Sequence, residues 1–156
     1  MTPKEKTLYA VFSEVRTCFN QLKMIAEQLH QDLDVNPSMR AVMEALAAKG
    51  PQTVPDIAKQ KGVSRQHIQT IMNALQEHEF VESFANPAHK RSPLFNVTEK
   101  GESTFAEVVA REKEPLRRLA ADMSSDTLES ARGALTQLNQ YLAEEISKGE
   151  HNETSS

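Results

Sequence analysis

The fold of this chain is decided by residues 57–71, which read IAKQKGVSRQHIQTI. Two helices that meet at a steep angle need a small residue where their backbones approach each other, and Ala58 provides it. The turn between them needs a residue that tolerates a positive φ, and Gly62 provides that. The apolar positions that would hold both helices on a core are Ile57, Val63, Ile68 and Ile71. The register of these residues predicts a helix-turn-helix.

The second of these helices, expected from Ser64 to about His78, carries a polar face without acidic residues. Its outward positions are Ser64, Arg65, Gln66, Gln69, Thr70 and Asn73. In the major groove of DNA, Gln and Asn match the edge of adenine and Arg matches that of guanine. The amino end of a helix also favours a phosphate. A solvated face without function is the alternative, but such a face usually contains Glu or Lys. We therefore predict that this face contacts double-stranded DNA.

Two short β-prone runs, residues 80–84 and 94–97, follow the helix-turn-helix and predict a β-hairpin. The segment between them, residues 85–93, is too long for a tight turn and should project. Its basic residues are His89, Lys90 and Arg91. On a projecting hairpin such residues can enter a minor groove or bind phosphate, whereas in an ordinary exposed loop they would have no role. A helix-turn-helix followed by such a hairpin is a winged helix.

Long apolar stripes lie near both ends of the chain. The first follows heptad spacing through Leu8, Phe12, Val15, Phe19, Leu22, Ala26, Leu29 and Leu33. The second runs through Leu128, Ala131, Leu135, Leu138 and Leu142. Within one small domain, stripes of this length need a second copy of the chain or a long partner helix to cover them. We predict a homodimer whose interface includes Leu8, Phe12, Val15, Leu135, Leu138 and Leu142.

The remaining segments read as shorter helices around the helix-turn-helix. Asn36 followed by Pro37 predicts a helix start, and that helix should reach Lys49. Its expected inward residues are Met39, Val42, Met43, Leu46 and Ala47. Residues 55–61 predict the first helix of the helix-turn-helix, with Gly62 ending it.

A further helix should begin after Thr98, and Pro115 should kink or break it. Its expected inward residues are Phe105, Val108, Val109, Leu116, Leu119 and Met123. In a regulator whose spacing changes on ligand binding, Pro115 would serve either as a hinge or as a static kink. The last helix should start at Ser124 and end at Gly149.

These elements predict a single domain of residues 1–156 with a mainly α fold. A winged helix-turn-helix with a small β-hairpin wing, residues 36–101, would be flanked by dimerisation helices in residues 1–35 and 102–148. Residues 149–156 should form a disordered tail.

Composition limits the remaining classes of function. The 156 residues carry a net charge of −4, so a general basic coat is absent. The single cysteine, Cys18, excludes an intramolecular disulfide and a cysteine-based zinc site, and we expect it to be packed and unreactive. Scattered histidines and the absence of a nucleophile–base pair predict no metal, no cofactor and no enzyme activity. The chain also lacks the apolar run of a signal peptide or membrane helix, so we expect a cytoplasmic protein.

Residues 54–58, 63–67, 86–94 and 97–101 together resemble the MarR family of bacterial transcription regulators. The resemblance implies an obligate homodimer built from the terminal helices and a palindromic operator. It also implies frequent repression and release by small aromatic or phenolic effectors. One departure concerns the wing, where Ala88 and His89 stand in place of the acidic residues that commonly orient an arginine in the family. Arg91 is nevertheless the expected minor-groove residue.

Two alternatives to a ligand-responsive repressor remain open at the level of sequence. A constitutive DNA-binding protein would keep the winged helix and lack the response to an effector. A helical protein-interaction module would use its winged helix to bind protein instead of DNA.

Overall fold

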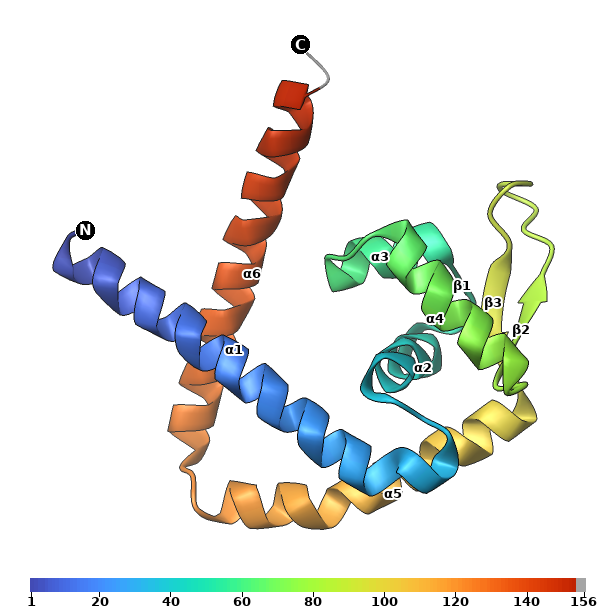
Figure 1. The fold of residues 1–156 in the computed structure, drawn as a ribbon, viewed down its shortest axis with the longest axis horizontal. Coiled ribbons are helices and arrows are strands. Elements are labelled where there is room, and N and C mark those ends of the chain that lie inside the picture. Colours follow the sequence, from blue (N-terminus) through green and yellow to red (C-terminus); the bar gives the residue numbers. More distant parts are fainter. Residues whose placement is uncertain (154–156) are drawn as a thin grey trace. The chain divides into compact units, whose positions relative to one another are not determined.

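The computed structural model describes residues 1–153, and its elements follow the predicted order (Figure 1). The elements are α1 (Pro3–His30), the short 3₁₀ turn η1 (Gln31–Leu33), α2 (Pro37–Lys49), β1 (Gln52–Thr53), α3 (Val54–Lys61), α4 (Arg65–Glu77), β2 (Val81–Phe84), β3 (Leu94–Val97), α5 (Glu99–Ala121) and α6 (Ser125–Glu153). The chain divides into two compact units, residues 1–112 and the residues from Lys113 onward. The predicted fold class, mainly α with a winged helix-turn-helix, is confirmed.

The hydrophobic core lies in the first unit, between α2, α3, α4 and the strands. The largest fully buried side chains include Met43, Leu46, Ile57, Ile68, Met72 and Leu75. The predicted inward face of α2 is correct except at Ala47, which is exposed while Ala45 is buried. Ala47 lies at the edge of the apolar stripe and lines an open cavity.

The predicted hairpin is part of a three-stranded antiparallel sheet with the strand order β1–β3–β2. Val81 pairs with Val97 and Phe84 with Leu94 across the hairpin. Strand β1 was not predicted because it contains only Gln52 and Thr53, which show no apolar alternation. It pairs with β3 at Phe95 and Leu94. This third strand joins the end of β3 nearest the hairpin tip to the segment that leads into α3.

The predicted helix boundaries in the first unit rest on side-chain caps. The Oδ1 atom of Asn36 accepts a hydrogen bond from the Met39 amide at 2.8 Å, and the Ser64 Oγ accepts one from the His67 amide at 3.0 Å. Thr98 likewise caps α5 through the Gly101 amide at 3.0 Å. Gly62 ends α3 with a φ of 67°, which is the positive value that the turn required. These predicted caps are confirmed.

Several predictions for the two later helices are wrong. Pro115 lies inside α5, which continues to Ala121, so the predicted break is absent, and a kink at this residue stays a prediction. Gly149 does not end α6, which extends to Glu153, since a glycine only weakens a helix unless it takes a left-handed conformation. The predicted disordered tail is therefore incorrect for residues 149–153, and residues 154–156 lie outside the described part.

Many apolar side chains of the long helices are exposed in the single chain. In α5 and just after it, four residues that were expected to face inward are exposed: Val109, Leu116, Leu119 and Met123. Cys18, expected to be packed, is also exposed.

The residues predicted for the dimer interface on α1 and α6 are mostly exposed in the single chain. Leu8, Val15, Leu135 and Leu142 are exposed, whereas Phe12 and Leu138 are partly covered. No helix in residues 1–153 combines the length and apolar character needed to cross a membrane.

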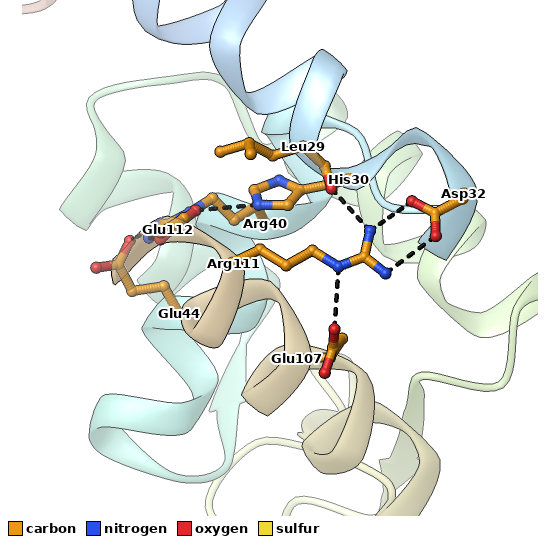
Figure 2. Close-up of polar contacts among 8 residues, drawn as sticks. All are labelled: Leu29, His30, Asp32, Arg40, Glu44, Glu107, Arg111 and Glu112. Atoms are coloured by element: carbon orange, nitrogen blue, oxygen red, sulfur yellow. Dashed lines mark hydrogen bonds and ion pairs between the residues drawn. The ribbon is translucent and has the colours of Figure 1, made fainter. Parts of the chain in front are cut away.

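Within the first unit, the carboxyl end of α1 is fastened to α2 and α5 by a group of charged side chains (Figure 2). We call this group the His30 cluster; its members are His30, Asp32, Arg40, Glu44, Glu107, Arg111 and Glu112. Arg40 binds both carboxylate oxygens of Glu112, at 2.5 and 2.6 Å. Arg111 binds Asp32 at 2.5 and 3.0 Å and also the Leu29 carbonyl at 2.9 Å. These ion pairs fix the helix that precedes the winged helix and the one that follows it.

Candidate nucleic-acid interface

The polar face predicted on α4 is exposed along its whole length. The opposite face is buried through Ile68, Ile71, Met72 and Leu75. All six predicted contact residues are exposed: Ser64, Arg65, Gln66, Gln69, Thr70 and Asn73. Val63, which was expected to fix α4 on the core, is instead 40% exposed because it lies in the turn, where its amide bonds to the Ala58 carbonyl at 3.1 Å. Helix α4 therefore presents its polar side to solvent while its apolar side completes the core.

Some of these polar groups already have partners within α4. The Gln69 amide donates to Asn73 Oδ1 at 2.9 Å, and the Thr70 hydroxyl donates to the Gln66 carbonyl at 3.0 Å. The Ser64 hydroxyl oxygen is used as the helix cap. Among the described residues, the guanidinium of Arg65 and the side-chain amide of Gln66 make no hydrogen bond or ion pair. These two side chains at the amino end of α4 are therefore free to bind another molecule.

The carboxyl end of α4 is held against the start of α5. Lys100 Nζ donates to the His78 carbonyl at 2.8 Å and lies 5.3 Å from the centre of the Phe80 ring. The Thr98 hydroxyl donates to the Glu79 carbonyl at 2.6 Å. A Cβ atom on Gly101 would lie 2.0 Å from the Phe80 carbonyl oxygen, so only glycine permits this approach. This contact was not predicted from the sequence, although a glycine three residues after a capping threonine was a signal for it.

The wing is the hairpin formed by β2 and β3, and the loop between these strands projects beyond the sheet (Figure 1). His89, Lys90 and Arg91 all lie exposed at its tip, as expected. Within the described part of the chain, neither Lys90 nor Arg91 has an acidic partner, which agrees with the lack of acidic residues at Ala88 and His89. The basic charge of the tip is therefore not neutralised by a neighbouring carboxylate.

Two further basic residues, Lys59 and Lys61, lie in the last turn of α3 and are exposed. They were not among the predicted contact residues, although their place directly before Gly62 puts them at the entrance to the turn. The exposed basic side chains around the helix-turn-helix thus include these two lysines and Arg65.

The electrostatics of the first unit are most strongly perturbed in the His30 cluster, away from the polar face of α4. The side chain of His30 is 0% exposed, and neither ring nitrogen makes a well-formed hydrogen bond. Its Nε2 atom lies 3.4 Å from Glu112 Oε1. Burial lowers the pKa of His30, and the nearby charges of Arg40 and Arg111 add to this effect, whereas Glu112 opposes it. The hydrogen bonds from Arg111 hold the pKa of Asp32 below its usual range.

Side chains that could ligate a metal do not gather at one place in the part of the chain that the structure describes. Across residues 1–153, there is no group of three or more His, Cys, Asp or Glu side chains that could hold a metal ion.

Comparison of the sequence supports the helix-turn-helix. A model of the RNA polymerase III subunit RPC82 helix-turn-helix domain matches residues 38–86, from the first turn of α2 to the wing. Uncharacterized proteins of Mycobacterium tuberculosis and Mycobacterium bovis are 33% identical over 86 residues, or 55% of this chain. The match covers 60% of each of these relatives, so the chain spans less than two thirds of their length.

Solved structures share the architecture of most of the chain. A MarR family transcription regulator matches with a TM-score of 0.75 and 23% identity over 90% of this chain and 93% of its own. Staphylococcus aureus MarR in complex with salicylate and kanamycin gives 0.76 at 15% identity, covering 90% and 95% of the two chains. A mutant Escherichia coli MarR complexed with operator DNA gives 0.75 at 15% identity, covering 85% and 95%. The fold of this chain is therefore that of the MarR family of transcription regulators.

Proposed function

We propose that this protein is a transcription regulator that binds specific double-stranded DNA sequences as a homodimer. The observation that carries the proposal is the acid-free polar face of α4, which is exposed from Ser64 to Asn73 while its other side forms the core. The complex of a mutant Escherichia coli MarR with operator DNA supports DNA binding by a protein of this fold.

In this proposal α4 enters the major groove and reads base edges. Arg65 suits guanine, and the amides of Gln66, Gln69 and Asn73 suit adenine. The free side chains of Arg65 and Gln66 stand at the amino end of α4, where recognition helices make most of their base contacts. Lys90 and Arg91 of the wing then enter the flanking minor groove or bind its phosphates.

The exposed apolar seams of α1 and α6 support a homodimer. Phe19 and Leu22 on α1 are 61% and 58% exposed, and Leu135 and Leu142 on α6 are exposed as well. A second copy of the chain would remove this apolar surface from water and would bring two recognition helices to one DNA molecule. Two half-sites about 34 Å apart fit a palindromic operator. Two linked sites also compensate for the modest positive charge of each.

We propose further that a small neutral phenol releases the protein from its operator and so relieves repression. An open cavity of about 330 Å³ in the first unit supports an effector of this size. Its lining residues are Leu46, Ala47, Gly50, Asn96, Val97, Glu102, Phe105 and Ala106. Because Glu102 is the charged residue of this lining, a neutral phenol suits the cavity better than an aromatic acid. The salicylate and kanamycin complex of Staphylococcus aureus MarR supports only the coarser part of this proposal, that a protein of this fold binds a small aromatic compound, since salicylate is itself an aromatic acid.

Fluorescence anisotropy with DNA from directly upstream of the gene tests the DNA-binding proposal. Specific binding should weaken steeply as salt rises. Arg65→Ala should lower the preference for this DNA over an unrelated duplex, whereas Lys90→Ala should lower the affinity for both by a similar factor. Equal binding by wild type and the double variant would contradict the assigned surface. Absence of any DNA binding would favour a protein-interaction module.

Thermal shift measurements with neutral phenols and with aromatic acids test the effector proposal. A phenol that raises the melting temperature should also lower the affinity for DNA. An Ala106→Phe variant, which partly fills the cavity, should lose both effects. If no compound changes either property, the protein is a constitutive DNA-binding protein.

A further inference from the structure

The side chain of Asn86 makes hydrogen bonds at both ends of the wing tip. Its Nδ2 atom donates a hydrogen bond to the Ser92 carbonyl at 3.0 Å, across the tip. Its Oδ1 atom accepts one from the Ala88 amide at 3.1 Å. The Asn86 carbonyl accepts a third from the His89 amide at 3.2 Å. Asn86 therefore contacts both the beginning and the end of the segment that carries the basic residues.

The rest of the tip has little else to hold it. The Ser92 amide bonds to the His89 carbonyl at 3.3 Å, and residues 87–91 are exposed. Lys90 and Arg91 lie within the span that Asn86 closes, and neither makes an ion pair in the described part of the chain. A flexible loop would lose much conformational entropy on entering a narrow groove, whereas a folded tip has lost it in advance.

We propose that Asn86 is the positioning residue of the wing: its side-chain amide presets the direction of Lys90 and Arg91 toward DNA. The inference rests on the proposed DNA-binding function. Lys90 and Arg91 have no carboxylate beside them to orient them. In this proposal the uncharged side chain of Asn86 orients them instead, by fixing the backbone of the tip. Asn86 itself does not touch DNA.

The chemistry of asparagine suits this role better than that of an acidic residue. An amide offers a donor and an acceptor at once, so it can bind the Ala88 amide and the Ser92 carbonyl together. A carboxylate could only accept and would leave the Ser92 carbonyl without its partner. It would also place a negative charge next to the phosphates of DNA, which would weaken binding.

The test compares four proteins with the wild type in anisotropy titrations with the upstream DNA at several salt concentrations. They are Asn86→Ala, the double variant Lys90→Ala/Arg91→Ala, the triple variant that combines all three changes, and Ser92→Ala. The last is the matched control, because it removes the Ser92 hydroxyl and leaves the carbonyl that Asn86 binds. Thermal unfolding of each variant reports whether the lobe remains folded.

We expect Asn86→Ala to bind about three- to tenfold more weakly per wing, as for the loss of one or two hydrogen bonds. The slope of log affinity against log salt should also become shallower, by up to about 0.9 for each phosphate that the wing no longer neutralises. In the double-variant background, adding Asn86→Ala should change neither quantity, because no basic side chains remain to be positioned. Ser92→Ala should bind like the wild type.

Two results would overturn the proposal while leaving DNA binding intact. One is a wild-type affinity and salt slope for Asn86→Ala. The other is an equal loss of affinity from Asn86→Ala in the wild-type and double-variant backgrounds, which would show that Asn86 acts independently of Lys90 and Arg91. If the wild-type protein itself fails to bind the upstream DNA, the proposed function fails, and the role of Asn86 with it.

Discussion

Helices α1 and α2 carry apolar stripes of the same helical period, yet only one of the two stripes is buried. In α2, Met43 is 0% exposed and Leu46 is 1% exposed, because α3, α4 and the sheet cover them. In α1, Phe19 and Leu22 are more than half exposed, and α1 is fixed in the first unit only near its carboxyl end. The helical spacing of apolar residues therefore predicts which face of a helix is to be buried, and it does not predict which element or molecule covers that face.

The two stripes should contribute to stability in different ways, one within a single chain and the other through association of two chains. The α2 stripe belongs to a core completed within one chain, so its contribution should not depend on protein concentration. The α1 stripe, together with that of α6, gains its cover only from another molecule in the proposed dimer. Its contribution should therefore depend on concentration.

The largest effect should come from placing a charge in the uncovered seam. We expect Val15→Glu to reduce the solution mass from two chains to one chain of 17.4 kDa, because an unpaired carboxylate in an apolar interface is costly. Affinity for a palindromic DNA should fall about 10²- to 10⁴-fold with the loss of the linked second site. Light scattering and anisotropy titration measure the two quantities.

Thr17→Glu is the matched control for this prediction. It adds the same charge to α1 two residues further along, off the apolar stripe. It should keep the mass of the wild type. A Val15→Glu protein that keeps that mass would show that this part of α1 is not in an interface, and the comparison with α2 would then lose its explanation.

The next largest effect should come from the completed core. Leu75 on α4 is 0% exposed, so Leu75→Ala should lower the free energy of unfolding by about 2–5 kcal/mol through reduced burial and a new cavity. Urea unfolding at two protein concentrations measures this loss. If the core is complete within one chain, the loss should be the same at both concentrations within error. A loss that depends on concentration would argue that α4 is also stabilised by the second copy.

The sequence was sufficient to predict the elements whose signals are local. The helix-turn-helix was identified from Ala58 and Gly62, and the caps of α2, α4 and α5 from Asn36, Ser64 and Thr98. Strand β1 was missed because its two residues owe their conformation to pairing with β3, which lies far later in the chain. The continuation of α6 beyond Gly149 was missed because the effect of one glycine on a long helix is small compared with the hydrogen bonds on either side.

The candidate site divides in the same way. The polar face of α4 was predictable because helical period places Arg65, Gln66, Gln69, Thr70 and Asn73 on one side, and Ser64 is recognisable as the cap before them. The role of Asn86 was not predictable, because it depends on the distance between the two ends of the loop that its side chain joins. The His30 cluster was not predicted either, because its members come from α1, η1, α2 and α5 and meet only after folding. Among the histidines of the sequence, nothing marked His30 as the buried one.

The smallest effect should come from the titration of His30, where α1 joins the lobe. Burial lowers the pKa of His30 in the folded protein below the ordinary value of 6.5 that it regains on unfolding. Above that pH the ring is neutral in both states, and its contribution to stability is complete. As the pH falls below 6.5, the unfolded chain binds a proton before the folded chain does, so the free energy of unfolding decreases.

Urea unfolding of wild type and His30→Gln between pH 8 and pH 5 isolates this contribution. The groups that face the ring are Glu112, Arg40 and Arg111, with Asp32 nearby. The wild type should lose more stability than His30→Gln as the pH falls, and the two curves should run parallel above about pH 7. His89→Gln, at the exposed wing tip, should follow the wild type. Parallel curves for wild type and His30→Gln over the whole range would contradict the prediction, because the ring would then bind protons equally in the folded and unfolded chains. A wild type that gains stability relative to His30→Gln as the pH falls would also contradict it, because the ring would then be protonated in the fold and paired with Glu112.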